Sequence, residues 1–227
     1  LPTDSISLDS VGNNWKVAVN SLDFDDNSFN YKVGEKPALK NKFDPNNLDF
    51  KKMNLKATDF YYDKALTKVS VSQFSAINRG NFAINSLATN FSMNEHSIST
   101  QKLKLKTPYS TIDADFSIQY ASMEAFTKSY QFSNLILNMR NVAFKSRDVL
   151  YFSLTLSKQP FFQNNTNTTT ITGNVTGAMK NLTGKNLVVK TGESTLLKTD
   201  FNMTGLPEMK TAFFDFPNLT IHTGKND

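Results

Sequence analysis

Residues 112–118 read Ile-Asp-Ala-Asp-Phe-Ser-Ile, with an apolar side chain at every even position and a polar one at every odd position. Successive side chains on a β-strand point to opposite faces, so this segment has one apolar and one polar face. The same period of two recurs in Lys-Leu-Lys-Leu-Lys at 102–106 and in Ile-Thr-Gly-Asn-Val-Thr-Gly at 171–177. These segments predict a β-sheet whose two faces differ chemically.

The alternation extends along most of the chain. It is densest over residues 48–120 and resumes at 135–139, at 150–154 and between 170 and 223. Shorter strand candidates at 15–19 and 28–33 flank an acidic segment, Asp-Phe-Asp-Asp-Asn at 23–27, that predicts a hairpin turn. We expect fourteen to sixteen short strands joined by local connections, and local connections favour antiparallel neighbours. The predicted fold class is therefore all-β, an elongated, antiparallel-rich sheet.

Two stretches depart from the period of two. Met123, Phe126 and Tyr130 are three and four residues apart behind Ser122, which predicts one short amphipathic helix near 122–130. The phase of the alternation also slips between Phe50 and Met53, which predicts a β-bulge or a turn there.

The composition is that of an ordinary folded protein. The 227 residues are 39% hydrophobic and 20% charged, and nineteen Phe stand against one Trp, so phenylalanine dominates the packing. We expect one fragment spanning 1–227, with a possible subdivision into strands and a loop (1–42), a sheet with the short helix (43–160) and a further sheet (161–227). The formal charge of +5 permits acidic partners. The lysines are dispersed, and no Arg-rich block or RNA-binding aromatic motif is present, so no nucleic-acid partner is predicted.

The residues that carry catalysis or bind metals are scarce. The chain has no cysteine, which excludes disulfides, thiolate metal sites and cysteine nucleophiles, and its two histidines, His96 and His222, lie in no recognised motif. The acidic segment 23–27 lacks the glycine and the distal glutamate of an EF-hand loop. Asp113 and Asp115 share one strand face, as paired acid and base carboxylates would, but a polar surface explains them more simply. We expect no catalytic residue, metal or cofactor, and not an enzyme.

The lysines at 102, 104 and 106 form a basic stripe along one strand. Such a stripe could contact phosphate head groups, whereas lysines on a strand also prevent edge-to-edge aggregation, and we favour the protective interpretation. The chain begins Leu-Pro-Thr-Asp, without a basic and apolar leader, and has no run of about 18 apolar residues. It is therefore interpreted as a piece of a longer chain.

Several segments, taken in order, resemble the translocation and assembly module B (TamB) proteins of the AsmA-like family, in particular the versions of Bacteroidota-type bacteria. The resemblance covers roughly residues 43–220, as a middle fragment. The matching segments are 43–48 (Phe-Asp-Pro-Asn-Asn-Leu), 55–57 (Leu-Lys-Ala), 60–62 (Phe-Tyr-Tyr), 120–126 (Tyr-Ala-Ser-Met-Glu-Ala-Phe), 146–152 (Ser-Arg-Asp-Val-Leu-Tyr-Phe), 173–177 (Gly-Asn-Val-Thr-Gly), 181–187 (Asn-Leu-Thr-Gly-Lys-Asn-Leu), 205–209 (Gly-Leu-Pro-Glu-Met) and 211–215 (Thr-Ala-Phe-Phe-Asp).

The resemblance implies a curved β-taco sheet with a hydrophobic groove, in a periplasmic protein anchored to the inner membrane. Such proteins are proposed to transport phospholipid to the outer membrane, or to assist outer-membrane protein assembly through a barrel partner. The N-terminal membrane helix and the terminal domain of that family are not in this sequence, so contacts with a barrel would use regions outside it. The family supplies no catalytic residue.

Two functions from different classes follow. The first is a groove for phospholipid or another acyl-chain lipid. The residues expected to line it are Leu103, Leu105, Ile112, Phe116, Ile118, Val175, Val189 and Phe201. The alternative is a closed β-sandwich or solenoid that acts as an adhesin-like or receptor-like interaction module at the cell surface, with a dry core.

Overall fold

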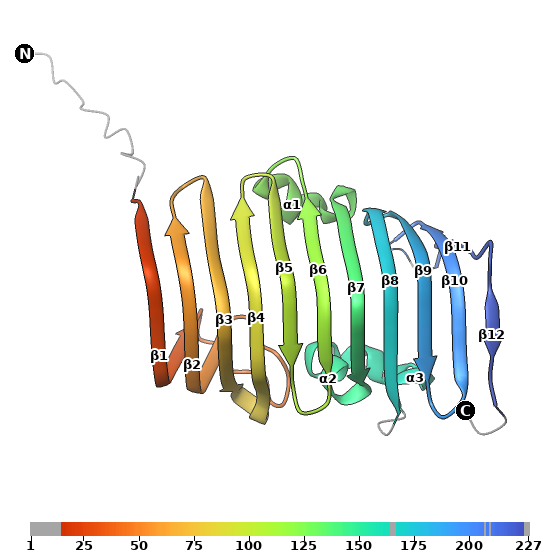
Figure 1. The fold of residues 1–227 in the computed structure, drawn as a ribbon, viewed down its shortest axis with the longest axis horizontal. Helices are drawn as coiled ribbons and strands as arrows, with labels where there is room; N and C mark the ends of the chain where they lie inside the picture. The colour runs from red at the N-terminus through yellow and green to blue at the C-terminus, as the bar shows by residue number, and fades with distance from the viewer. Residues whose placement is uncertain (1–14, 164–166, 207, 209, 225–227) are drawn as a thin grey trace, which may run out of the picture.

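The described residues form one antiparallel sheet in which each strand from β1 to β11 pairs with the next along the chain (Figure 1). The computed structural model describes residues 15–163, 167–206, 208 and 210–224. The strands are β1 (Val17–Lys32), β2 (Asn47–Tyr62), β3 (Leu66–Asn78), β4 (Phe82–Asn94), β5 (Ser97–Lys106), β6 (Thr111–Gln119), β7 (Asn134–Lys145), β8 (Thr168–Ala178), β9 (Asn181–Thr191), β10 (Thr195–Thr204), β11 (Phe213–Asp215) and β12 (Thr220–His222). Both β11 and β12 pair with β10, so the two short strands share its outer edge.

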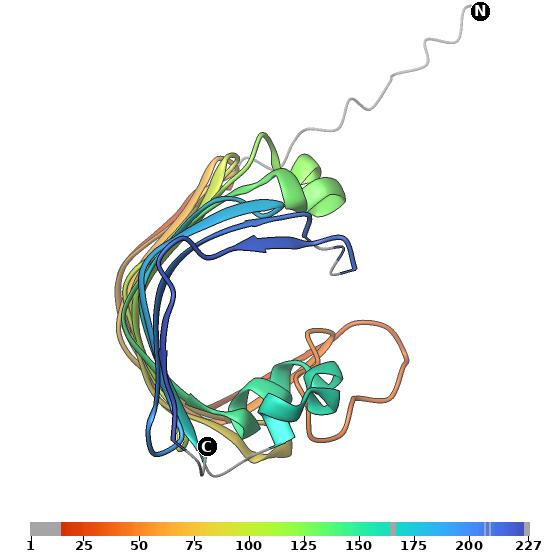
Figure 2. The same cartoon turned by 90° about the vertical axis from the view of Figure 1, so that its right-hand side faces the viewer.

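The sheet is curved like the letter C in cross-section, with short helices at the two lips (Figure 2). Helix α1 (Met123–Ser129) lies at one lip, and helices α2 (Ser146–Phe152) and α3 (Pro160–Gln163) lie at the other. Three 3-10 turns complete the described elements: η1 (Arg79–Asn81), η2 (Tyr130–Phe132) and η3 (Leu154–Lys158). We call the concave side of the sheet, between the two lips, the trough; it runs across the strands.

The curvature follows from β-bulges. Every pairing from β1–β2 to β9–β10 contains at least one register shift. A bulge adds a residue to one strand of a pair, and the longer strand bends and twists. Because the shifts recur along the whole sheet, each strand bends in turn and the sheet closes part-way around the trough.

Three of the bulges share one device, in which a residue with positive φ donates its backbone N–H to a side chain of the next strand. The pairs are Asp26 (φ 50°) with Asn54 Oδ1 at 3.0 Å, Lys102 (φ 54°) with Asp115 Oδ1 at 2.6 Å, and Asn186 (φ 54°) with Asp200 Oδ1 at 2.8 Å. The acceptors are polar side chains on the polar face of the sheet. The extra residue therefore lies on that face, which lengthens it and bends the sheet toward the apolar face.

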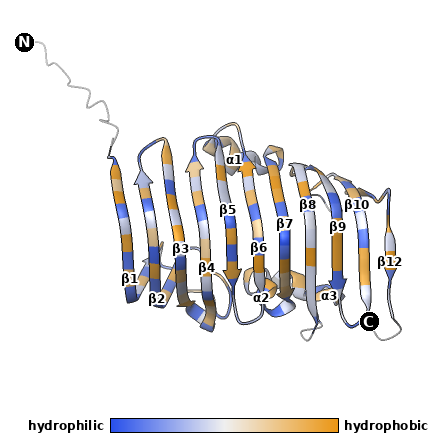
Figure 3. Cartoon of the chain, viewed as in Figure 1, coloured by the Kyte–Doolittle hydropathy of each residue, from blue (hydrophilic) through white to orange (hydrophobic). Residues whose placement is uncertain are grey.

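Packing of the helices identifies the concave face. In α1 the ring of Phe126 stacks on Tyr120, 5.0 Å away, and Tyr120 is two residues beyond the apolar-face residue Ile118. In α2 the ring of Tyr151 stacks on Phe82 at 4.2 Å, at the start of β4. Since both helices lie at the opening of the C, the apolar face is the concave face. Apolar and polar bands alternate along the strands in Figure 3.

The all-β fold class is confirmed, and so are two local predictions. Helix α1 begins behind Ser122, whose side chain accepts the N–H of Ala125 as predicted for a helix cap. The phase slip between Phe50 and Met53 is a bulge, in which Lys52 has φ 50° and the β2–β3 register shifts.

The predicted strand number is too high, because β1 is one strand. Residues 15–19 and 28–33 were predicted as separate strands around a hairpin turn at 23–27. In the structure the acidic segment lies within β1 as a bulge at Asp26, paired throughout with β2. The described residues thus hold twelve strands, longer and fewer than the fourteen to sixteen expected.

The strand predicted at 150–154 is also wrong, since Tyr151 and Phe152 end helix α2 and residues 154–158 form η3. A helix brings Asp148 and Tyr151, three residues apart, to one buried face, and that burial outweighs the β-propensity of the aromatic residues. The prediction that the lysines at 102, 104 and 106 protect an edge of the sheet is also wrong. Strand β5 lies between β4 and β6, and Lys102 is itself a bulge residue.

Candidate functional site

The candidate site is the concave face of the sheet, built from rows of side chains that face one another across neighbouring strands. Residues paired across an antiparallel ladder lie on the same face, so the register defines each row. One row is apolar across eleven strands: Phe24, Leu55, Phe74, Leu87, Leu105, Ile112, Val142, Ile171, Val189, Leu197 and Ile221. This row runs the length of the sheet without a polar residue.

Two further rows lie on the same face. The first runs through Val69, Phe91, Thr100, Phe116, Leu137, Val175, Gly184 and Phe201. The second runs through Ile98, Ile118, Leu135, Gly177, Leu182, Met203 and Phe214. From β4 to β10 the register places no Asp, Glu, Lys or Arg on this concave face.

The structure brings all eight predicted lining residues to this face. Ile118 and Val175 are buried, at 6% and 9% exposure, and the other six are half-buried. Their role as a lipid lining stays a prediction. Sequence reasoning missed partners that complete the rows, such as Leu135, Leu182 and Leu197, because a row becomes visible only once the register is known.

The packing is densest over β7 to β10, where Val175, Leu182 and Leu187 form the buried cluster. Leu135, Leu137, Met139, Phe201 and Met203 pack against it from neighbouring strands. No second sheet covers this cluster within the described ranges, and no large side chain there is less than 2% exposed. The closed β-sandwich expected as an alternative is therefore wrong as an architecture.

Side-chain contacts attach the helices at each lip to the neighbouring strand ends. At one lip the Tyr120 hydroxyl donates to the carbonyl of Asn94 at 3.0 Å, beneath helix α1. At the other lip the Tyr151 hydroxyl accepts from Asn78 Nδ2 at 3.2 Å and donates to the carbonyl of Arg79 at 3.0 Å. The Phe43 ring, from the loop between β1 and β2, lies 5.3 Å from the Phe152 ring. Hydrogen bonds and ring contacts thus join α2 and this loop to the ends of β3 and β4.

The convex face carries the charges. Asp113 and Asp115 lie on it and hold Arg140, whose Nε is 2.6 Å from Asp113 Oδ1 and whose Nη1 pairs with Asp115. Neither aspartate faces the trough, so they are not placed as an acid and base pair for a ligand there. The hydrogen bond from Arg140 and the N–H of Lys102 hold the pKa of Asp115 below its ordinary value.

This ion pair predicts a dependence of stability on pH. Because the folded pKa of Asp115 lies below the unfolded one, the ionised carboxylate stabilises the fold above about pH 4, and that stability is lost as the pH falls through the folded pKa. In Arg140→Gln we expect the pKa of Asp115 to rise and acidification from neutral pH to destabilise the variant less than the wild type. NMR titration of the carboxyl carbon, with urea unfolding at pH 7 and pH 3, measures both.

The matched control is Arg79→Gln, which removes a different surface pair, with Asp49 at 3.6 Å. The pKa of Asp115 should be the same in this control as in the wild type. An Arg140→Gln variant with an unchanged Asp115 pKa would show that the guanidinium is not the main cause.

The structure places the two histidines on different elements, the β4–β5 turn and β12. The Nδ1 atom of His96 lies 2.8 Å from the carbonyl oxygen of Ala121, which ties the β4–β5 turn to the segment before α1. His222 is exposed on β12. Among the residues that the structure describes, no group of three His, Asp or Glu side chains is placed to hold a metal ion. In the same part of the chain no helix is both long enough and apolar enough to cross a membrane.

No protein-family model, curated protein or solved structure matches the chain.

Proposed function

We propose that this chain is a segment of a periplasmic, bridge-like protein whose apolar trough carries phospholipid between the inner and outer membranes. The observation that carries the proposal is the concave face itself, a wall without charges from β4 to β10 that no second layer of the described residues covers. The resemblance of residues 43–220 to the TamB proteins supports the same function and suggests the periplasmic location.

The energetics suit a lipid path. Each methylene group kept from water contributes about 0.8 kcal/mol, so exposing a sixteen-carbon chain to water costs on the order of 10 kcal/mol. Ten strand spacings of about 4.8 Å make the trough roughly 48 Å long from β1 to β11. An acyl chain that moves along such a wall stays in apolar contact, so most of the cost of crossing water is removed. A charge on this wall would interrupt the path.

A pair of adjacent positions on β7 tests the proposal. Leu137 lies on the concave face opposite Phe116 and Val175, whereas Ile136 lies on the convex face and is 40% exposed. Both residues are apolar. A photoreactive phenylalanine analogue at position 137 therefore probes the concave face, and the same analogue at position 136 probes the convex face at the same point along the sheet. After irradiation of the purified chain with phospholipid vesicles, we expect lipid adducts at position 137 and not at 136, measured by mass spectrometry.

The same preparations give a second measurement. Organic extracts of the protein, purified without detergent, should contain phospholipid at close to one molecule per chain. Equal labelling at positions 136 and 137 together with lipid-free extracts would contradict the proposal and favour an interaction module instead.

A further inference from the structure

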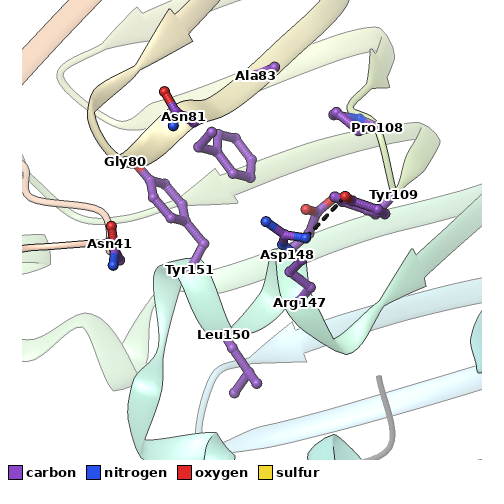
Figure 4. A pocket seen from close by; sticks show the side chains of 11 residues that line it. Asn41, Gly80, Asn81, Ala83, Pro108, Tyr109, Arg147, Asp148, Leu150 and Tyr151 are labelled. Atoms are coloured by element: carbon purple, nitrogen blue, oxygen red, sulfur yellow. Dashed lines mark hydrogen bonds between the residues drawn. The ribbon is translucent and has the colours of Figure 1, made fainter. Parts of the chain in front are cut away.

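A cavity of about 480 Å³ lies beside helix α2 at one lip of the trough (Figure 4). Four segments that are distant in sequence form it: the loop before β2, the start of β4, the β5–β6 turn and α2. The residues that line it include Asn41, Phe82, Tyr109, Arg147, Asp148 and Tyr151. Aromatic rings, amide groups, a carboxylate and a guanidinium thus line the same cavity.

Arg147 is the cation of this cavity. Its Nη1 atom donates to the Tyr109 hydroxyl at 3.0 Å, and its guanidinium carbon lies 4.8 Å from the centre of the Tyr109 ring. The carboxylate of Asp148 instead accepts the hydroxyls of Thr107 and Ser110. In the part of the chain that the structure describes, no carboxylate lies within 4.0 Å of the Arg147 guanidinium.

The two other arginines of the chain provide the contrast. Arg140 pairs with two aspartates on the convex face, and Arg79 pairs with Asp49. A guanidinium has five N–H donors in a planar fork that matches the oxygens of a phosphate. Arg147 donates one of these N–H groups to the neutral Tyr109 hydroxyl, and its guanidinium lies against the Tyr109 ring. Its remaining donors are placed to bind an anion in the cavity.

The cavity adjoins the apolar face of the sheet at Phe82. The Phe82 ring lines it, and Ile84, two residues further along β4, lies on the same face of the strand and pairs with Ala76. The fully apolar row that contains Leu87 and Leu105 follows within a few residues. A ligand with a polar group beside Arg147 would thus lay an apolar tail directly on the trough wall.

We propose that this cavity binds the phosphate group of a phospholipid, with Arg147 as its principal ligand and the acyl chains on the adjoining trough wall. The proposal rests on the proposed function and assigns the headgroup end of the same site. Arg147 binds and orients the phosphate, and Tyr109 positions Arg147. The apolar rows then hold the acyl chains whatever the headgroup, so the two contributions can be separated by experiment.

The test compares two short-chain lipids and inorganic phosphate by calorimetry on the full chain. Dihexanoyl phosphatidylglycerol carries the phosphate, and dihexanoylglycerol lacks it. Charge-assisted hydrogen bonds are strong enough that Arg147→Gln should weaken binding of the phospholipid by about tenfold or more and leave dihexanoylglycerol within about twofold. Arg147→Lys, which keeps the charge without the fork, should be intermediate. Lys104→Gln, on the convex face, should match the wild type.

The outcomes distinguish the two proposals. If both lipids bind the wild type and Arg147→Gln equally well, the headgroup site is wrong and the trough stands. If neither lipid binds the wild type, the proposed function fails as well. If inorganic phosphate alone binds as tightly as the phospholipid and with the same dependence on Arg147, the cavity takes free phosphate, and the lipid source is wrong.

Discussion

Replacing Phe116 by aspartate is expected to abolish the retention of phospholipid by the trough while the sheet stays folded. Phe116 lies on β6 between Thr100 and Leu137, in the middle of a row on the uncharged wall. An acyl chain that covers the new carboxylate removes it from water, and the effective penalty is several kcal/mol. Binding of a fluorescent phospholipid should therefore weaken by about a hundredfold or more, measured by titration from vesicles.

Two matched variants separate the effect of the charge from that of the fold. Ser117→Asp adds the same carboxylate one residue along β6 but on the convex face, opposite Ser99 and Ile136, and should bind lipid as the wild type does. Phe116→Leu keeps the wall apolar and should bind within about threefold of the wild type. Far-ultraviolet circular dichroism and the melting temperature report whether each variant is folded. A folded Phe116→Asp protein that still binds phospholipid normally would contradict the trough.

Local alternation was enough to predict the sheet and its two faces, because the period of two is a property of single strands. The pattern at 112–118 placed Ile112, Phe116 and Ile118 on one face, and the structure does the same. The bulges at Asp26 and Lys102 were harder to predict. At a bulge the strand continues, although the break in the alternation predicts that it ends. The side chain that accepts the hydrogen bond of the bulge residue also lies on another strand, as Asn54 does for Asp26. Acidic and amide residues that elsewhere form turns here bend the sheet.

The cavity at α2 could not be predicted for a different reason. Asn41, Phe82, Tyr109 and Arg147 lie in four segments that meet only after the sheet has curved. Residues 150–154 were predicted as a strand, whereas the burial of Asp148 and the contacts of Tyr151 with Phe82 and Asn78, which no local pattern contains, favour a helix over 146–152. Among the described residues, the absence of a carboxylate within 4.0 Å of the Arg147 guanidinium is also a property of the folded chain. The proposed role of Arg147 therefore rests on comparing the partners of the three arginines in the structure.

The largest effect on stability is expected from Gly184→Ala. Gly184 lies on β9 opposite Phe201 of β10, and a Cβ atom there would be 2.2 Å from Cε1 of the Phe201 ring and 2.9 Å from Cδ1 of Leu187. The Phe201 ring therefore occupies the space that the missing side chain leaves. Overpacking of this kind costs about 1–3 kcal/mol, so the free energy of unfolding should fall by that amount and the melting temperature by roughly 2–12 °C.

A double-mutant cycle with Phe201→Ala identifies the cause. Once the ring is removed, adding Gly184→Ala should cost less than about 0.5 kcal/mol, because the added methyl group then meets only Cδ1 of Leu187, the end of a flexible side chain that can move aside, and alanine is no worse than glycine in a strand. Thr183→Ala, one residue away on the convex face, should change stability by no more than about 0.5 kcal/mol on its own. If the losses of unfolding free energy in the two single variants add up in the double variant, the cost of Gly184→Ala lies in the β9 backbone and not in contact with the ring. Strong coupling would show that the Phe201 ring fills the space over Gly184 of β9, in the most densely packed part of the concave face.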